Sequence, residues 1–111
     1  MSASHAPARP RPLAAEAVQA WLASHPDWQY DTNERSGLLR RQFTFADFPA
    51  AFGFMAEIAI HAERMDHHPE WFNVHRRVDV VLTTHDGPGV TSLDLELAER
   101  MERASARHGA A

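Results

Sequence analysis

Three histidines and several acids are the side chains of this sequence best suited to chemistry. His67 and His68 are adjacent, and His85 follows them after a β-rich segment. Imidazole titrates near neutral pH, so it can both give and take a proton. The acids and the aromatic residue that accompany these histidines are Glu63, Asp66, Glu70, Trp71 and Asp94.

Two chemistries fit three histidines. Three imidazoles can bind zinc and leave one position open for water or substrate. Neighbouring side chains diverge, however, and histidines spaced by four, the usual helical zinc pattern, are missing here. Proton transfer to a leaving hydroxyl is the other use, and nearby aromatic residues would suit a flat heterocycle. The spacing slightly favours an acid–base enzyme over a metal site.

Each of these residues also has a plain structural interpretation. A histidine pair at the end of a helix is most often solvated. Thr91 and Asp94 have the spacing of a capping box, which would make Asp94 a helix cap. Only the convergence of several such residues at one place favours function.

The elements that must position these residues follow from hydrophobic periodicity. Alternation with a period of two predicts strands, and apolar residues spaced by three and four predict helices. The expected strands are 28–31, 38–45, 71–74 and 78–84, and the expected helices are 13–24, 47–65 and 91–106. The last two strands would form a hairpin with its turn near Arg76 and Arg77. The order α-β-β-α-β-β-α predicts an α+β fold, with an antiparallel sheet covered by helices on one face.

The helix over 47–65 has the clearest pattern. Asp47 is a suitable N-cap, and Pro49 is acceptable in the first turn. Phe54 lies off the main apolar stripe, so we expect a second apolar surface there that could meet another subunit. The stripe itself consists of Phe48, Ala51, Phe52, Met55, Ile58, Ala59, Ala62 and Met65.

This connectivity brings the candidate residues together. The histidine pair ends one helix and leads into the third strand. In an antiparallel hairpin the end of the fourth strand lies beside the start of the third, which places His85 near His67 and His68. Asp94 begins the next helix a short loop later. Three histidines and two or three carboxylates are therefore expected at one end of the sheet.

Composition excludes several classes. Cysteine and lysine are both absent, which excludes disulfides, cysteine nucleophiles and lysine Schiff bases. The net charge of −4 argues against a nucleic-acid binder, and no apolar run is long enough to span a membrane. No signal peptide is recognisable, so a cytoplasmic location is expected. Residues 1–12 read as a disordered tail, and residues 13–108 as a single domain.

These segments resemble a known family, the pterin-4a-carbinolamine dehydratases, also known as dimerization cofactors of hepatocyte nuclear factor. The resemblance runs from about Trp28 to Glu102. The residues that carry it are Phe43 to Phe48, Ala51 to Met55, Ala62 and Glu63, Asp66 to Val74, Leu82 to His85, Gly89 and Asp94.

The resemblance implies an α+β fold with a four-stranded antiparallel sheet and three helices. It implies dehydration of 4a-hydroxytetrahydropterin to quinonoid dihydropterin, in pterin recycling after an aromatic amino acid hydroxylase. No metal and no cofactor other than the pterin substrate are implied, and homo-oligomers, either dimers or tetramers, are expected. The implied catalytic residues are His67, His68 and His85, with support from Glu63, Asp66, Trp71 and Asp94.

Two other classes remain as alternatives. One is a non-catalytic oligomer that docks on another protein through the surface around Phe54. The other is a zinc-dependent hydrolase that uses the three histidines as ligands.

Overall fold

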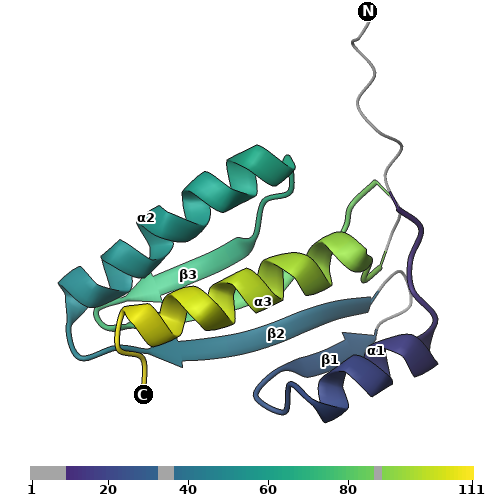
Figure 1. The fold of residues 1–111 in the computed structure, drawn as a ribbon, viewed down its shortest axis with the longest axis horizontal. Coiled ribbons are helices and arrows are strands. Elements are labelled where there is room, and N and C mark those ends of the chain that lie inside the picture. Colours follow the sequence, from purple (N-terminus) through teal and green to yellow (C-terminus); the bar gives the residue numbers. More distant parts are fainter. Residues whose placement is uncertain (1–9, 33–36, 87–88) are drawn as a thin grey trace, which may run out of the picture.

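The computed structural model describes residues 10–32, 37–86 and 89–111, and it confirms the predicted fold class (Figure 1). Three helices and four strands follow one another in the expected order. In sequence they are α1 (Ala15–Ala23), β1 (Gln29–Thr32), β2 (Gly37–Thr44), α2 (Phe48–Met65), β3 (Glu70–Val74), β4 (Arg77–Leu82) and α3 (Ser92–Arg107).

The strands form one antiparallel sheet in the order β1-β2-β4-β3, so β1 and β3 are its edges. The helices cover one face, and Figure 1 shows α2 and α3 side by side in front of the strands. Alternation along β2 and β4 explains this layering. Leu39 and Phe43 of β2 and Val78 and Val80 of β4 are buried, while Arg40, which follows Leu39, is exposed.

The face of α2 that meets the sheet differs from the predicted stripe. Phe54, expected on a separate surface, is fully buried, and its ring centroid lies 4.9 Å from that of Phe43 and 5.0 Å from that of Phe45. Phe48 and Phe52 are instead 47% and 59% exposed. Apolar residues occur on nearly every side of this helix, so their spacing alone did not select the buried face. The expectation of a docking surface around Phe54 is therefore wrong.

The ends of α2 and α3 are defined by polar contacts that the sequence predicted. Asp47 caps α2 by accepting a hydrogen bond from the Ala50 N–H at 2.9 Å. Thr91 and Asp94 form the predicted capping box at the start of α3. Helix α2 ends at Met65, and Asp66 follows it in the left-handed conformation with φ of 50°. The chain then turns directly into His67, His68 and β3.

The hairpin turn lies one residue earlier than predicted. It consists of His75 and Arg76, and His75 has a positive φ of 54°. Asn73 supports the turn, because its side-chain amide donates to the carbonyl oxygens of His75 and Arg77 at 3.1 and 2.9 Å. An asparagine two residues before the turn was the signal that the sequence offered.

Some expectations fall on residues that are not described. Residues 1–9 of the predicted tail and residues 33–36 and 87–88 of the predicted loops lie outside the described ranges. Residues 10–12 precede α1 and form neither helix nor strand. Among the helices of the described residues, none combines the length and the apolar character needed to cross a lipid bilayer.

Candidate active site

The three candidate histidines lie around one hollow of about 240 Å³ at the end of the molecule where α2 and β4 end and α3 begins (Figure 1). Two short segments supply its walls: the residues that follow α2, and the residues that follow β4 together with the turn that they lead into. The lining residues are Asp66, His67, His68, Thr83, Thr84, His85 and Asp86.

His67 is the buried member of the group. Only 4% of it is exposed, and its Nε2–H donates to Oδ1 of the fully buried Asp94 at 2.6 Å. The other carboxylate oxygen, Oδ2, accepts from the Thr84 hydroxyl at 2.8 Å and from the Thr91 N–H at 2.9 Å. Asp94 therefore caps α3 and holds His67 at once. Because Nε2 is occupied, Nδ1 is the ring nitrogen with which His67 can meet a ligand in the hollow.

His68 and His85 also contact carboxylates, but in solvent. Nε2 of His68 lies 3.0 Å from Oε1 of Glu63, and Nε2 of His85 lies 3.0 Å from Oε2 of Glu70. The side chains of His68 and His85 are 58% and 75% exposed. All three histidines thus point the same ring nitrogen at an acid, although only one pair is shielded from water.

The structure unites most of the predicted site residues. His67, His68, His85 and Asp66 line the hollow itself, and Asp94 and Glu63 reach it through the histidines that they bind. Trp71 is the exception: it is half-buried, packs against the hydrophobic core, and is not part of the lining.

Thr83, Thr84 and Asp86 line the hollow but were not predicted as site residues. Glu70 was noted beside the histidines but was given no role in the site. Glu70 begins β3 and pairs with His85, a contact that follows from the antiparallel pairing of β3 with β4. Thr84 binds Asp94, and its position beside His85 in the Thr83-Thr84-His85 run was the only sequence signal for it.

The zinc interpretation gains no geometric support. Within residues 10–32, 37–86 and 89–111, no three histidine, aspartate or glutamate side chains gather in an arrangement that could hold a metal ion. Each histidine of the hollow faces a different carboxylate rather than a shared centre.

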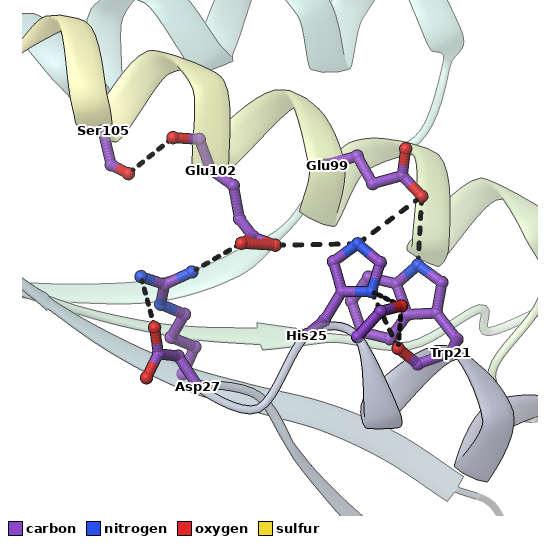
Figure 2. Close-up of polar contacts among 8 residues, drawn as sticks. Trp21, His25, Asp27, Glu99, Glu102 and Ser105 are labelled. Carbon is purple, nitrogen blue, oxygen red and sulfur yellow. Dashed lines mark hydrogen bonds and ion pairs between the residues drawn. The ribbon is translucent and has the colours of Figure 1, made fainter.

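Another histidine, His25, lies away from the hollow and has several partners of its own. Its ring stacks on Trp21 with centroids 3.9 Å apart, and its Nδ1 donates to the Trp21 carbonyl oxygen at 2.7 Å. Nε2 lies 3.9 Å from carboxylate oxygens of both Glu99 and Glu102 (Figure 2). This cluster joins the end of α1 to α3.

Comparison with known proteins identifies the family. The sequence profile of the pterin 4 alpha carbinolamine dehydratases matches residues 11–104. The chain belongs to this family. The match extends over both the hollow and the helices that form it, so the resemblance predicted from the sequence is confirmed.

Individual members of the family are similar over most of the chain. A relative from Rhizobium leguminosarum bv. trifolii is 50% identical over 92 residues, which cover 83% of this chain and 89% of the relative. One from Bordetella avium is 51% identical over 89 residues, which cover 80% of this chain and 81% of the relative. The names of both describe pterin-4-alpha-carbinolamine dehydratases, which are hydro-lyases.

Solved structures share the fold. A transcriptional coactivator/pterin dehydratase from Brucella melitensis superposes with a TM-score of 0.79 at 43% identity, over 86% of this chain and 99% of the other. A pterin dehydratase-like protein, described as a RuBisCO assembly factor in the alpha-carboxysome, superposes with a TM-score of 0.61. At 16% identity, this second likeness concerns the fold alone.

Proposed function

We propose that this protein dehydrates pterin-4a-carbinolamine by histidine acid–base catalysis. The observation that carries the proposal is the meeting of His67, His68 and His85 around one hollow, each with Nε2 against a carboxylate. Membership of the dehydratase family supplies the substrate class. We place the reaction in tetrahydropterin recycling, where the carbinolamine is formed by an aromatic amino acid hydroxylase.

The reaction needs one acid and one base. The C4a–O bond breaks as the hydroxyl takes a proton and leaves as water, while N5 loses its proton and the C4a=N5 double bond forms. No net oxidation occurs, so imidazoles alone can supply both proton transfers. The ring atoms of the pterin stay in place, and only a hydroxyl and a proton depart.

The different surroundings of the histidines suggest a division of roles. His68 is exposed, and among the described residues its ring bonds only the exposed Glu63, so the ring can adjust to the substrate; we assign to it the principal proton transfer. His67 is held by Asp94 and would offer Nδ1 to the hydroxyl. His85 would assist from the opposite strand end. Asp66 would support the substrate from the rim of the hollow.

The role of Trp71 is the least supported part of the assignment. Trp71 packs against the core, so it would act by shaping the start of β3 beside Glu70 rather than by lining the hollow. Its contact with substrate stays a prediction from the family resemblance.

A direct assay tests the proposal. The carbinolamine is generated by a phenylalanine hydroxylase, and its decay to quinonoid dihydropterin is followed by absorbance with and without this protein. We expect the protein to accelerate the decay well beyond the uncatalysed rate, with and without a chelator. A folded protein that leaves the decay unchanged would refute the proposed activity, and loss of activity on chelation would restore the zinc interpretation.

We also propose that the protein is a homo-oligomer that forms through the free edge of β3. The two edges of the sheet differ: β1 carries the polar residues Gln29 and Asp31 on the open face, whereas β3 exposes Phe72 by 61% and Val74 by 44% there. An unpaired edge with apolar residues favours pairing with an identical edge across a twofold axis.

Light scattering after gel filtration tests the oligomer. We expect a mass of at least two chains for the unmodified protein and a smaller mass for Phe72→Glu. Phe52→Ser, on the exposed side of α2, serves as the matched control. A monomeric unmodified protein would refute the assignment, and loss of the oligomer only in Phe52→Ser would move the interface to α2.

A further inference from the structure

Thr84 is a buried hydroxyl between the end of β4 and the hollow. Its backbone forms an isolated bridge with Gly89, and its N–H donates to the Gly89 carbonyl oxygen at 2.9 Å. Only 2% of the residue is exposed. Its Oγ1 lies 2.8 Å from Oδ2 of Asp94 and also 2.8 Å from Oγ1 of Thr91.

The direction of these hydrogen bonds follows from the number of protons. An ionised carboxylate can only accept, so the single hydroxyl proton of Thr84 is donated to Asp94. The Thr91 hydroxyl must then donate to Thr84, while its own oxygen accepts from the Leu93 N–H at 3.2 Å. A directed chain therefore runs from Thr91 through Thr84 to Asp94, and Asp94 receives the His67 Nε2–H on its other oxygen.

We propose that Thr84 is a positioning residue of the active site. The two oxygens of Asp94 have different partners, and the Thr84 hydroxyl holds Oδ2 so that Oδ1 faces His67. Within the part of the chain that the structure describes, the ring of His67 makes no other hydrogen bond, so the orientation of the carboxylate sets the orientation of the imidazole. Partners one step behind a functional side chain commonly fix its geometry in this way.

A substitution that removes the Thr84 hydroxyl but keeps the size of the side chain would loosen the hold on the Asp94 carboxylate. Thr84→Val replaces the hydroxyl with a methyl group, leaves the Thr91 hydroxyl without its acceptor, and leaves Oδ2 of Asp94 with the Thr91 N–H alone. Thr84→Ser keeps the donor and removes only a methyl group. A positioning role predicts that serine restores what valine loses.

The inference rests on the proposed dehydratase activity, so the experiment has two readouts. The first is steady-state kinetics: we expect Thr84→Val to lower kcat on the order of 10- to 100-fold, the usual cost of losing such a partner, with a smaller change in KM. The second is the NMR signal of the His67 Nε2 proton, which burial and the 2.6 Å hydrogen bond should protect from exchange. We expect that signal in the unmodified protein and in Thr84→Ser, and its broadening or loss in Thr84→Val.

Ser105→Ala is the matched control, because it removes a different buried hydroxyl. Ser105 lies on α3, away from the hollow, and its hydroxyl donates to the Glu102 carbonyl oxygen at 2.8 Å. It should leave both readouts unchanged.

Unchanged kcat and an unchanged His67 signal in Thr84→Val would overturn the inference, as would equal losses in Thr84→Val and Thr84→Ser. If the unmodified protein lacks dehydratase activity but its His67 signal depends on Thr84, the proposed function fails and the positioning role stands. If Thr84→Val does not fold, Thr84→Ala replaces it. A failure of both to fold would show a folding role instead and overturn the inference.

Discussion

Two groups of histidines in this molecule bind carboxylates, but their surroundings differ. At the end of the sheet, His67, His68 and His85 come from two chain segments and meet around a hollow. In the helical layer, His61 and His108 both approach Glu57, with Nε2 to carboxylate oxygen distances of 3.7 and 3.0 Å.

The helical group is held among cations. Arg107 also pairs with Glu57, and Arg100 lies 3.1 Å from Nδ1 of His61. His108 packs on Gly53, where an added Cβ would lie only 3.1 Å from its ring. These contacts join α2 to the end of α3, in the way that His25 joins α1 to α3 (Figure 2).

The difference shows that a histidine–carboxylate pair does not by itself mark a reactive site. In the helical layer, Glu57 joins α2 to the end of α3 through Arg107 and His108, and its pair with His61 lies within α2. The effects of these pairs should appear in stability. The pairs at the end of the sheet leave ring atoms facing a shared hollow, and their effects should appear in turnover. Substitutions in the two groups test this separation.

The largest effect is expected for His68→Ala. Turnover should fall on the order of 10²–10⁴-fold, the usual contribution of a general acid–base group. The side chain of His68 is 58% exposed, so the melting temperature should change little. Steady-state kinetics and thermal unfolding provide the two measurements.

The same substitution in the helical layer, His25→Ala, is the control. It removes the stack on Trp21 and should lower stability without lowering kcat. Equal turnover losses in the two variants would erase the separation between the groups.

Asp94→Asn should lower both turnover and stability, because Asp94 belongs to the site and to the helix cap. An amide puts an NH2 group, which only donates, in place of one of the two oxygens that accept hydrogen bonds from His67, Thr84 and Thr91. A buried mismatch of this kind costs about 1–3 kcal/mol of unfolding free energy. Denaturant titration and kinetics provide the measurements.

Thr91→Ala separates the two roles of Asp94. It removes the other side chain of the capping box but keeps the carboxylate and its bond to His67. Its expected cost is about 1 kcal/mol, with turnover much less affected than in Asp94→Asn. If both variants lose stability equally and neither loses turnover, Asp94 is only a cap.

Glu70→Gln probes an exposed pair of the site. The side chains of Glu70 and His85 are 55% and 75% exposed, so the unfolding free energy should change by less than about 0.5 kcal/mol. Turnover should fall several-fold in the unmodified background and not at all when His85 is already alanine, because Glu70 acts through His85. A loss that persists in the His85→Ala background would assign Glu70 a role of its own.

The smallest effect concerns His61. Burial, and then the charges of Arg100, Arg64 and Arg103, hold the pKa of His61 below its usual value. The unfolded chain therefore binds this proton at higher pH than the folded chain, so stability is lost as pH falls from about 7 towards about 5. His61→Gln should show a shallower loss over this range and unchanged turnover. Parallel stability curves for the two proteins would contradict this expectation.

Much of the fold was accessible from local patterns. The alternation along 38–45, the capping residues Asp47 and Thr91, and the apolar spacing of the last helix placed every element within about two residues of its observed bounds. These signals depend on contacts between near neighbours in sequence, so a single sequence contains them. The convergence of the three histidines also followed, because a hairpin brings the ends of its strands together.

Other features depended on which surfaces meet in three dimensions. Phe52 and Phe54 have the same side chain on one helix, yet only the packing of α2 on β2 buries Phe54. Arg41 is similar: it lies on the same side of β2 as Phe43, its side chain is only 12% exposed, and it pairs with Asp27 and Glu102. Burial lowers the pKa of its guanidinium. No local sequence pattern around Arg41 predicts that it pairs with Glu102 on α3, because the two residues are far apart in the chain.

The order of the elements, their caps and the residues able to do acid–base chemistry could be read from the amino-acid sequence, because each follows from short-range periodicity or residue type. Three features required the folded chain: Asp94 both caps α3 and binds His67, Thr84 binds the second oxygen of Asp94, and Trp71 lies outside the hollow. These outcomes depend on hydrogen bonds and packing between segments far apart in the chain. Their geometry exists only once the sheet and its helices have come together.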